Sequence, residues 1–317
     1  MDNEDLLPYR TGTYLIFDND PERPAKDGNF RSGRSLDPPL RASGSHQLDA
    51  EMLADVVNRI AEEGPDVRGM LIVDLRQESH AFLDGRAVSW CADEDWSNVG
   101  QAPAWIARDE QCQVEKLTAA PDTLVYAVRK DGDGNIEVTG RSPVLVTRPE
   151  TEEMVVARLQ NRFAISYLRL HVTDHCAPDD EAVRAFLQLF GNVAATTWVH
   201  FHCHGGDGRT TTFLTMYDRL AAARARGPNG SPPDLEYFRN RQLRLFHYDL
   251  NPHAALKRWQ APLSEVRWRR LESFREYIFD GYATGQPWPG LSHSRPSHLD
   301  EQAITGSPPS PENAGTG

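Results

Sequence analysis

A cysteine and an arginine separated by five residues are the strongest candidates for chemistry in this chain. Residues 202–210 read HCHGGDGRT, so that three glycines lie between Cys203 and Arg209. Such a turn lets successive backbone N–H groups point into one concavity, which suits a phosphate-like anion. The same groups stabilise a thiolate, and the planar fork of an arginine can hold two oxygens of the anion. The spacing therefore predicts a cysteine nucleophile directed at a phosphorus atom.

Two elements must position this loop, and the flanking sequence predicts both. Residues 197–202 are rich in β-branched and aromatic side chains, which indicates a buried strand. Apolar residues at helical spacing predict a helix from Arg209 to about Arg226, which Gly227 and Pro228 end. The positive end of that helix dipole would face the loop. A glycine-rich turn with a buried free cysteine is the alternative interpretation.

Three segments resemble one known family. The loop is similar to the signature of cysteine-dependent phosphatases of the protein-tyrosine-phosphatase superfamily. GRTT at 208–211, NFRS at 29–32 and DLRQESH at 74–80 are most similar to the tyrosine-phosphatase-like inositol polyphosphate phosphatases, or cysteine phytases. The resemblance implies an α/β fold with a central sheet, helices on both faces and a small inserted partial β-barrel. It also implies a phosphocysteine intermediate and no cofactor.

Asp174 is the best candidate for the general acid, because ester cleavage needs a proton for the departing oxygen. It follows a predicted strand at 165–171 and precedes Cys203 by 29 residues. The family has Thr-Asp-His on a mobile loop here, as this chain does with Thr173 and His175. The family usually has Trp-Pro shortly afterwards, whereas this chain has Ala177 and Pro178.

The resemblance assigns further roles residue by residue. Thr210 would donate to the thiolate as it leaves. Direct substrate contacts are expected from His204, Gly205, Gly206, Asp207, Gly208, Arg31, His175 and Lys130. A supporting role is expected for His202, which would orient the loop, and for Asp74 and Arg76, which would pair with each other and brace it.

Asp207 departs from the family, where the position is commonly neutral or basic. A carboxylate inside a phosphate loop opposes anion binding unless it points outward to pair with a base. The departure argues against a heavily phosphorylated substrate without arguing against the chemistry.

Histidines at positions 200, 202 and 204 alternate around Cys203 and raise the alternative of a metal site. A tetrahedral site needs convergent ligands, so no metal is predicted. Cys176, two residues after Asp174, is either a resolving cysteine for an oxidised Cys203 or a buried apolar thiol.

The predicted organisation has a phosphatase core at 1–85 and 148–293, an inserted β-rich domain at 86–147 and a disordered tail at 294–317. Helices are expected at about 45–63, 101–117, 147–162, 178–190, 234–248 and 263–279. Strands are expected at 14–17, 70–74, 124–130, 136–139 and 143–147, besides the two named above. The basic residues of the last third are either a solvated helix face or a wall of the substrate cleft.

Composition limits the partners. The 317 residues carry a net charge of −12, which argues against nucleic acid. The chain has no apolar run long enough to span a membrane, and its acidic start lacks a signal-peptide core. Four scattered cysteines form no disulfide framework. We expect a cytoplasmic protein, or one secreted without a cleavable signal, and the oligomeric state stays open.

The predicted function is phosphomonoester hydrolysis through a phosphocysteine, on myo-inositol polyphosphates. The partner would be such a phosphorylated small molecule or a phosphoprotein. A protein tyrosine phosphatase and a non-catalytic phosphate-binding interaction protein are the alternatives.

Overall fold

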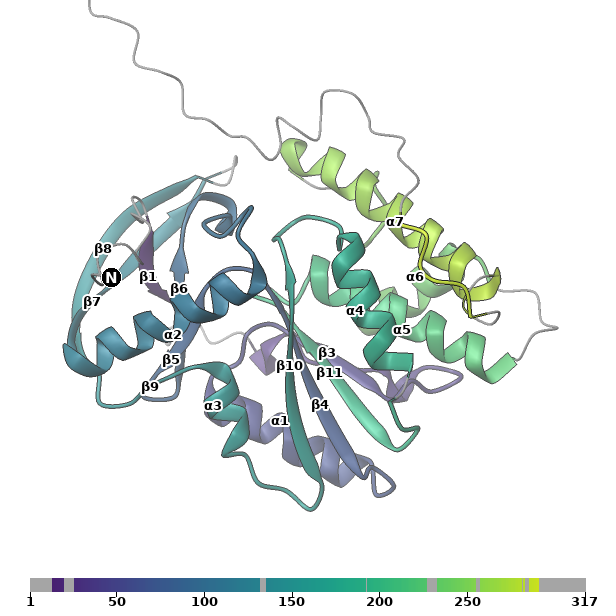
Figure 1. Cartoon of the computed structure of the whole chain (residues 1–317), viewed down its shortest axis with the longest axis horizontal. Coiled ribbons are helices and arrows are strands. Elements are labelled where there is room, and N and C mark those ends of the chain that lie inside the picture. The colour runs from purple at the N-terminus through teal and green to yellow at the C-terminus, as the bar shows by residue number, and fades with distance from the viewer. Residues whose placement is uncertain are drawn as a thin grey trace, which may run out of the picture.

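A computed structural model describes residues 13–19, 26–131, 135–191, 193–226, 233–254, 257–280, 282 and 285–290 (Figure 1). The predicted tail at 294–317 lies outside these residues. The strands are β1 (Tyr14–Phe17), β2 (Arg31–Ser32), β3 (Ala42–Ser45), β4 (Gly69–Arg76), β5 (His80–Leu83), β6 (Arg86–Cys91), β7 (Asp122–Lys130), β8 (Ile136–Leu145), β9 (Pro149–Glu150), β10 (Ala164–Val172) and β11 (Thr197–His202). The helices are α1 (Ala50–Glu63), α2 (Pro103–Ala119), α3 (Glu152–Ala157), α4 (Asp180–Gly191), α5 (Gly208–Arg226), α6 (Leu235–Leu245) and α7 (Ala261–Asp280). Short 3₁₀ turns are η2 (Lys26–Asn29), η3 (Gly33–Ser35), η4 (Asp93–Asp95) and η5 (Arg258–Gln260).

A five-stranded sheet in the order β10-β4-β11-β3-β2 forms the centre of the larger lobe. The first four strands are parallel, and β2 pairs antiparallel to β3. Parallel strands place their carboxyl ends at one edge, which is where an open α/β sheet binds its ligands. Asp74, Val172 and His202 all lie at or near that edge.

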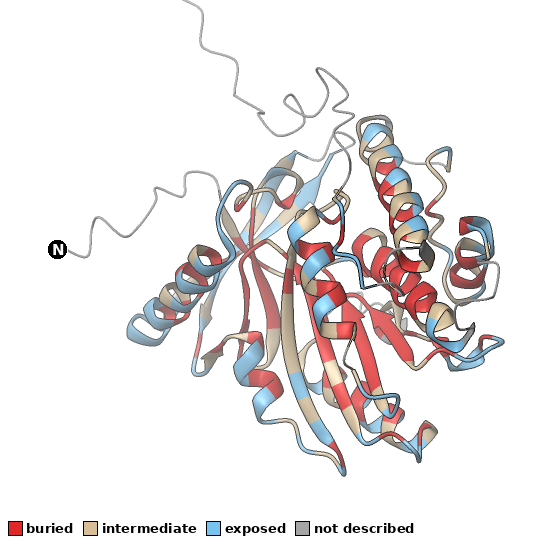
Figure 2. Ribbon diagram, turned by 45° about the vertical axis from the view of Figure 1, so that its right-hand side comes forward, coloured by how far each residue is buried: buried red, intermediate tan, exposed pale blue. Residues whose placement is uncertain are grey.

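Helices cover both faces of this sheet, as expected (Figure 1). Alternate residues such as Val73 and Phe201 pack against α4, α5 and α7, while Ile72 and Trp198 pack against α1 and α3. This two-residue alternation gives the chain two apolar cores separated by one sheet. Figure 2 shows the central strands and the inner faces of the surrounding helices as buried.

A second lobe contains the four-stranded sheet β1-β6-β5-β9, the ribbon β7-β8 and α2 (Figure 1). Tyr14 of β1 packs edge-on against Tyr126 of β7, with ring centroids 5.2 Å apart. Sheet and ribbon thus pack together, although no described strand pairing joins them into a closed barrel. The division of the chain at 86 and 147 stays a prediction, since β1, β5 and β9 outside that range belong to the same sheet.

The predicted elements around the loop are confirmed, and three expectations elsewhere are wrong. The helix expected from about residue 45 begins only at Ala50, after the N-cap Asp49, because residues 42–45 form strand β3. The helix expected over about 147–162 is shorter, since α3 begins after the N-cap Thr151, whose Oγ1 accepts from the Met154 N–H, and ends at Ala157. The segment 143–147 forms no third strand, because β8 runs on without a break to Leu145.

Candidate active site

The loop between β11 and α5 lies at the carboxyl edge of the sheet. Cys203 follows the last residue of β11 and is 2% exposed. Gly206 has a φ of 76°, and a Cβ there would lie 2.6 Å from the backbone nitrogen of His46. Only glycine fits this position, because both the backbone conformation and the space exclude a side chain. Gly208 begins α5, so the loop leads directly into the positive end of that helix.

Three carbonyls of the loop are held from outside. The Gln47 N–H donates to the His204 carbonyl at 3.0 Å, Asn29 Nδ2 donates to the Gly205 carbonyl at 3.0 Å, and Arg31 Nη2 donates to the Gly206 carbonyl at 2.7 Å. In a trans peptide the C=O and the following N–H point in opposite directions. The next three N–H groups therefore turn away from these partners, toward the inside of the loop. N–H groups that converge in this way form the kind of concavity that can bind an anion.

Thr210 lies where the resemblance implies. Its Oγ1 donates a hydrogen bond to the Cys203 Sγ at 3.1 Å, and it is itself fully buried in the first turn of α5. A hydroxyl at this position stabilises the thiolate form of the cysteine.

Arg209 is fixed from behind by a carboxylate. Its two terminal nitrogens donate to the two oxygens of Glu78 at 2.7 and 2.9 Å. Arg209 Nη1 also donates to the Val172 carbonyl at 3.2 Å. Among the described residues Arg209 Nε has no hydrogen-bond partner. An oriented guanidinium with a spare donor suits an oxyanion bound in the loop.

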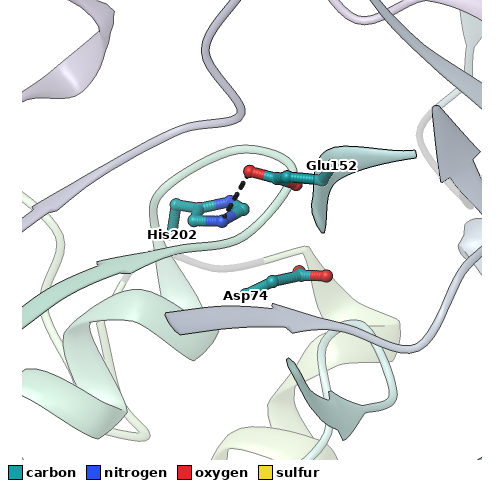
Figure 3. A group of neighbouring side chains, drawn as sticks. All are labelled: Asp74, Glu152 and His202. Carbon is teal, nitrogen blue, oxygen red and sulfur yellow. Dashed lines mark ion pairs between the residues drawn. The ribbon is translucent and has the colours of Figure 1, made fainter. Parts of the chain in front are cut away.

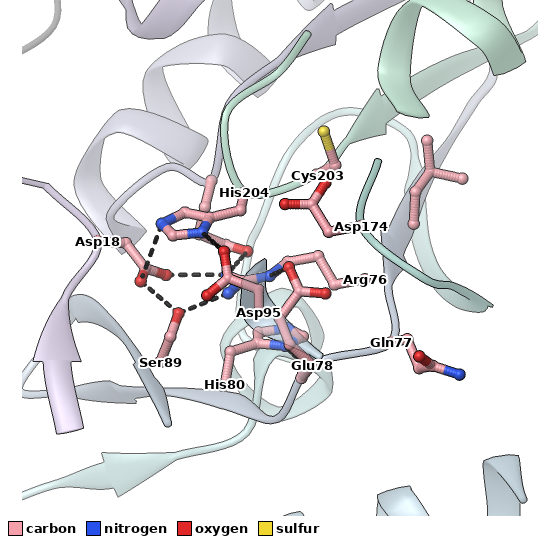
Figure 4. Close-up of polar contacts among 12 residues, drawn as sticks. Asp18, Arg76, Gln77, Glu78, His80, Ser89, Asp95, Asp174, Cys203 and His204 are labelled. Carbon is pink, nitrogen blue, oxygen red and sulfur yellow. Dashed lines mark hydrogen bonds and ion pairs between the residues drawn. The ribbon is translucent and has the colours of Figure 1, made fainter. Parts of the chain in front are cut away.

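Asp174 lies on the loop that follows β10, beside Arg209. Its Oδ1 is 3.1 Å from Arg209 Nη2 and accepts the His175 N–H at 2.8 Å. Trp96 Nε1 donates to the Asp174 carbonyl at 3.0 Å, so the second lobe holds this loop. Figure 4 draws Asp174 and Cys203 together with the carboxylates around Arg76.

Arg31 contacts the loop, although mainly as a support. Besides the Gly206 carbonyl, its Nη2 donates to Thr211 Oγ1 at 2.9 Å, and its guanidinium carbon lies 4.3 Å from the ring centre of Phe246. Burial lowers the pKa of Arg31 to about 10, partly offset by Cys203 and Asp207. The side chain thus stays charged near neutral pH.

The expected pairing of Asp74 with Arg76 is wrong. Asp74 accepts only the backbone N–H of Arg76, at 2.8 Å, and its carboxylate otherwise meets Tyr167, His80 and Arg169. The Arg76 guanidinium extends toward the second lobe instead. It contacts Asp18 at 2.8 Å, Glu78 at 2.9 Å and Gln47 at 2.9 Å, and it donates to Ser89 (Figure 4). Arg76 therefore links the two lobes through Glu78 to Arg209.

His204 and Lys130 meet at a carboxylate that the sequence analysis missed. Lys130 Nζ donates to Asp95 Oδ2 at 2.6 Å, and the same oxygen lies 3.2 Å from His204 Nδ1. Burial lowers the pKa of Lys130, but the Asp95 carboxylate outweighs it and raises the pKa overall. Lys130 thus reaches the loop through Asp95 and His204. Asp95 has a φ of 62°, in the left-handed region, and no sequence pattern predicted this conformation.

His202, Asp74 and Glu152 form a buried group whose ligand atoms lie within 4.8 Å of one another (Figure 3). His202 Nε2 is 3.1 Å from Glu152 Oε1. His80 also enters the group, 3.3 Å from Asp74 and 3.1 Å from Glu152. Burial lowers the pKa of His80, but Asp74 outweighs it and raises the pKa to about 10. The protonated imidazole already neutralises these carboxylates, so a cation fits poorly and the absence of a metal stays a prediction.

The basic helix α7 contributes one arginine to the wall of the site. Arg267 Nη1 donates to the Tyr248 hydroxyl at 2.9 Å, and Nη2 donates to the His175 carbonyl. A Cβ on Gly208 would lie 3.0 Å from Arg267 Nη1, so the arginine lies directly against the loop. By contrast, Arg269 of the same helix is exposed, as expected for a residue on a solvated helix face.

Cys176 lies behind the Asp174 loop, where it lines a cavity of about 760 Å³ together with Trp96, His171 and Pro103. Burial raises the pKa of the Cys176 thiol to about 11. A thiol that stays protonated attacks poorly, which favours the apolar alternative for this residue.

Comparisons with known proteins agree with this geometry. A family model of protein-tyrosine-phosphatase-like phytases, described by the term inositol hexakisphosphate, matches residues 73–220. Effector protein hopD2 of Pseudomonas syringae pv. tomato is 28% identical over 241 residues, which are 75% of this chain and 48% of that protein. No helix among the described residues is both long and apolar enough to cross a membrane.

Two solved structures are similar over most of the chain. The phosphatase of Mitsuokella multacida in complex with myo-inositol-(1,3,4,5)-tetrakisphosphate has a TM-score of 0.73 and 25% identity, covering 89% of this chain and 48% of that one. A phytase of Bdellovibrio bacteriovorus has a TM-score of 0.67 and 29% identity, covering 88% and 94%. The chain spans about half the length of the effector and of the Mitsuokella protein. Residues 73–220 therefore match the protein-tyrosine-phosphatase-like phytase family model, and the fold over most of the chain is similar to that of two solved proteins of this kind.

Proposed function

We propose that the protein is a cysteine-dependent phosphatase that hydrolyses phosphomonoesters of inositol polyphosphates. One observation carries the proposal: Cys203 lies at the floor of a loop whose N–H groups turn inward, beside an arginine that Glu78 orients. Preorganised donors around an anion are the largest catalytic contribution available to an enzyme of this kind.

The reaction would have two steps. The Cys203 thiolate attacks phosphorus in line, the bond to the leaving oxygen breaks, and Asp174 gives that oxygen its proton. Water then attacks the phosphocysteine and loses a proton to Asp174, so that the P–S bond breaks and phosphate leaves. Arg209 and the inward N–H groups stabilise the charge of both transition states. Thr210 supports the thiolate as it departs.

Inositol polyphosphate is the preferred substrate because a relative of the same fold was solved with an inositol tetrakisphosphate. Basic side chains around the loop, Arg31 and Arg267 among them, suit the further phosphates of such a molecule. Phosphotyrosine protein is the second candidate, since the carboxylate of Asp207 disfavours a polyanion. Whether the protein acts in the cytoplasm or after secretion stays a prediction.

Phosphate release from inositol hexakisphosphate, a phosphotyrosine peptide and a small aryl phosphate tests the proposal. Wild type should release phosphate from all three, fastest from the inositol ester, and Cys203→Ser should release none. Cys112→Ser is the matched control, since Cys112 lies half-buried on α2 in the other lobe. If wild type releases no phosphate at any pH from about 4 to 8, a window that brackets carboxylate and thiol titration, the non-catalytic alternative replaces the enzyme.

A further inference from the structure

A second basic pocket lies beside the loop, at the outer edge of the central sheet. Its volume is about 400 Å³, and four arginines line it: Arg31 of β2, Arg34 of η3, Arg59 of α1 and Arg244 of α6. These residues come from four different elements, so the fold rather than one basic run of sequence assembles them. In a chain of net charge −12, such a concentration of guanidinium groups needs an explanation.

The positive charge of this pocket is only partly neutralised. Glu63 is the one acid in its lining, and Arg59 Nε already binds it at 2.8 Å. The side chains of Arg34 and Arg244 form no hydrogen bond or ion pair with any described residue; Asp66, which pairs with Arg41, is an acid outside the lining that also attracts Arg34. Arg31 is buried, and its Nε is likewise without a partner there. Three cationic groups thus have donors to spare.

The chemistry of the lining selects a tetrahedral oxyanion. Guanidinium forks match the oxygens of phosphate, and the hydroxyls of Ser32 and Ser35 in the same wall add neutral donors. We propose that this pocket is a second binding site for a phosphate group, separate from the Cys203 loop. Neither Cys203 nor Arg209 lines it.

The two sites share Arg31. One arm of its guanidinium holds the Gly206 carbonyl and Thr211 of the catalytic loop, and the side chain also forms a wall of the pocket. A phosphate in the pocket therefore acts on the residue that orients the loop. The proposal does not require turnover, so it stands or falls independently of the proposed function.

The test follows the Nε–H signals of arginines by ¹H–¹⁵N NMR while sulfate, a phosphate mimic, replaces chloride at constant ionic strength. The signals of Arg34, Arg59 and Arg244 should shift together and saturate with one dissociation constant. Arg244→Gln should weaken that constant about tenfold or more, the effect of losing one charge-assisted hydrogen bond. Arg269→Gln removes the same charge from an exposed position outside the pocket and should change nothing. Shifts that never saturate, or that are equal in the two variants, would overturn the proposal.

Two further arms sharpen the result. Saturating the Cys203 loop with orthovanadate should leave the Arg34 response in place; its disappearance would mean that sulfate acts from the loop, and the pocket proposal would fail. Titrating the Cys203→Ser protein with inorganic phosphate and with inositol hexakisphosphate identifies the source. Tighter binding of the ester assigns a phosphate of a larger molecule to the pocket, and equal affinity assigns the free anion.

Discussion

Arg209 and Glu78 face each other through two parallel hydrogen bonds, 2.7 and 2.9 Å long, and both side chains are at most 2% exposed. Glu78 also binds Arg76 at 2.9 Å. One carboxylate thus orients Arg209 and ties it to Arg76, which reaches into the second lobe. Burial raises the pKa of Glu78, but Arg209 and Arg76 outweigh it and lower the pKa to about 2.

Glu78→Gln should reduce both activity and stability. The amide keeps the shape but leaves two buried guanidinium groups short of a counter-charge, which costs about 3 kcal/mol of unfolding free energy. A less firmly oriented Arg209 should lower kcat/KM about 10–100-fold, the range for one charged hydrogen bond. Glu137→Gln, which breaks an exposed pair with Arg129, should change neither quantity. If Glu78→Gln is less stable but keeps the kcat/KM of wild type, Glu78 stabilises the fold and does not orient Arg209 for catalysis.

The stabilisation contributed by Glu78, Glu152 and His80 together should be greatest between about pH 4.5 and 6.5, the ordinary pKa values of Glu and His. Glu78 and Glu152 have folded pKa values of about 2; burial raises that of Glu152, but His202 and His80 outweigh it. Their stabilisation is complete above the unfolded pKa near 4.5 and is lost as pH falls toward 2. His80 has a folded pKa of about 10, so its stabilisation is complete below 6.5 and is lost as pH rises toward 10.

Urea unfolding at about pH 3, 5.5 and 8.5, values chosen to sample these limbs, measures that profile. His80→Gln should flatten the alkaline limb and leave the acid limb. The exposed His253 offers the matched control, because His253→Gln should preserve both limbs. If His80→Gln loses as much unfolding free energy at alkaline pH as wild type does, a group other than His80 causes that loss.

The loop and its flanking elements were predictable because they obey local rules. β11 alternates its packing between two cores, and α5 carries its apolar residues at helical spacing. β3 escaped prediction because Ala-Ser-Gly-Ser has no apolar pattern. Its buried serines are satisfied by His200 at 2.9 and 3.1 Å. A Cβ on Gly44 would lie 2.6 Å from Thr210, so close packing on α5 rather than hydrophobicity selects these residues.

The supporting carboxylates could not be found from sequence alone. Asp18, Glu78 and Asp95 come from separate segments and converge on Arg76, Arg209 and His204 only through the pairing of β1 with β6 and the contact between lobes. Nothing in the spacing of these acids distinguishes them from the other 43 Asp and Glu residues, out of 46 in all. Glu78 lies inside the DLRQESH segment, so the resemblance identified this segment as part of the site but did not predict that Glu78 binds Arg209.

Asp174→Asn should still bind substrate but should turn it over more slowly. The loss of turnover should be larger when the leaving group is more basic. General acid catalysis contributes about 10²–10⁴-fold, so the loss should be that large for phenyl phosphate and small for a nitrophenyl ester. Asp179→Asn is the matched control: it lies on the same loop, and its Oδ1 accepts the Ala182 N–H, which an amide oxygen also can. Equal losses on good and poor leaving groups would remove Asp174 from the acid role.

Asp207→Asn should shift specificity toward more highly phosphorylated substrates. Asp207 lies between two glycines of the loop, is half-buried, and forms no side-chain hydrogen bond or ion pair with any described residue. Burial raises the pKa of its carboxyl, with Arg31 and His247 opposing. While ionised, the carboxylate repels the further phosphates of a polyanion. Removing it should raise kcat/KM on inositol hexakisphosphate about 3–10-fold relative to phenyl phosphate, as Coulomb's law gives for charges several ångströms apart at intermediate dielectric.

The pH dependence separates this repulsion from a change in loop shape. The pKa of the Asp207 carboxyl is raised above its ordinary value of 3.8. As pH falls through this raised pKa the carboxylate becomes neutral, so the ratio of wild-type kcat/KM on inositol hexakisphosphate to that on phenyl phosphate should approach the ratio of Asp207→Asn. Asp122→Asn removes an equal charge from an exposed position on β7 and should leave the preference at every pH as in wild type. If Asp207→Asn changes both substrates by the same factor, or its advantage is as large at low pH as at neutral pH, the carboxylate does not act through charge on the distal phosphates.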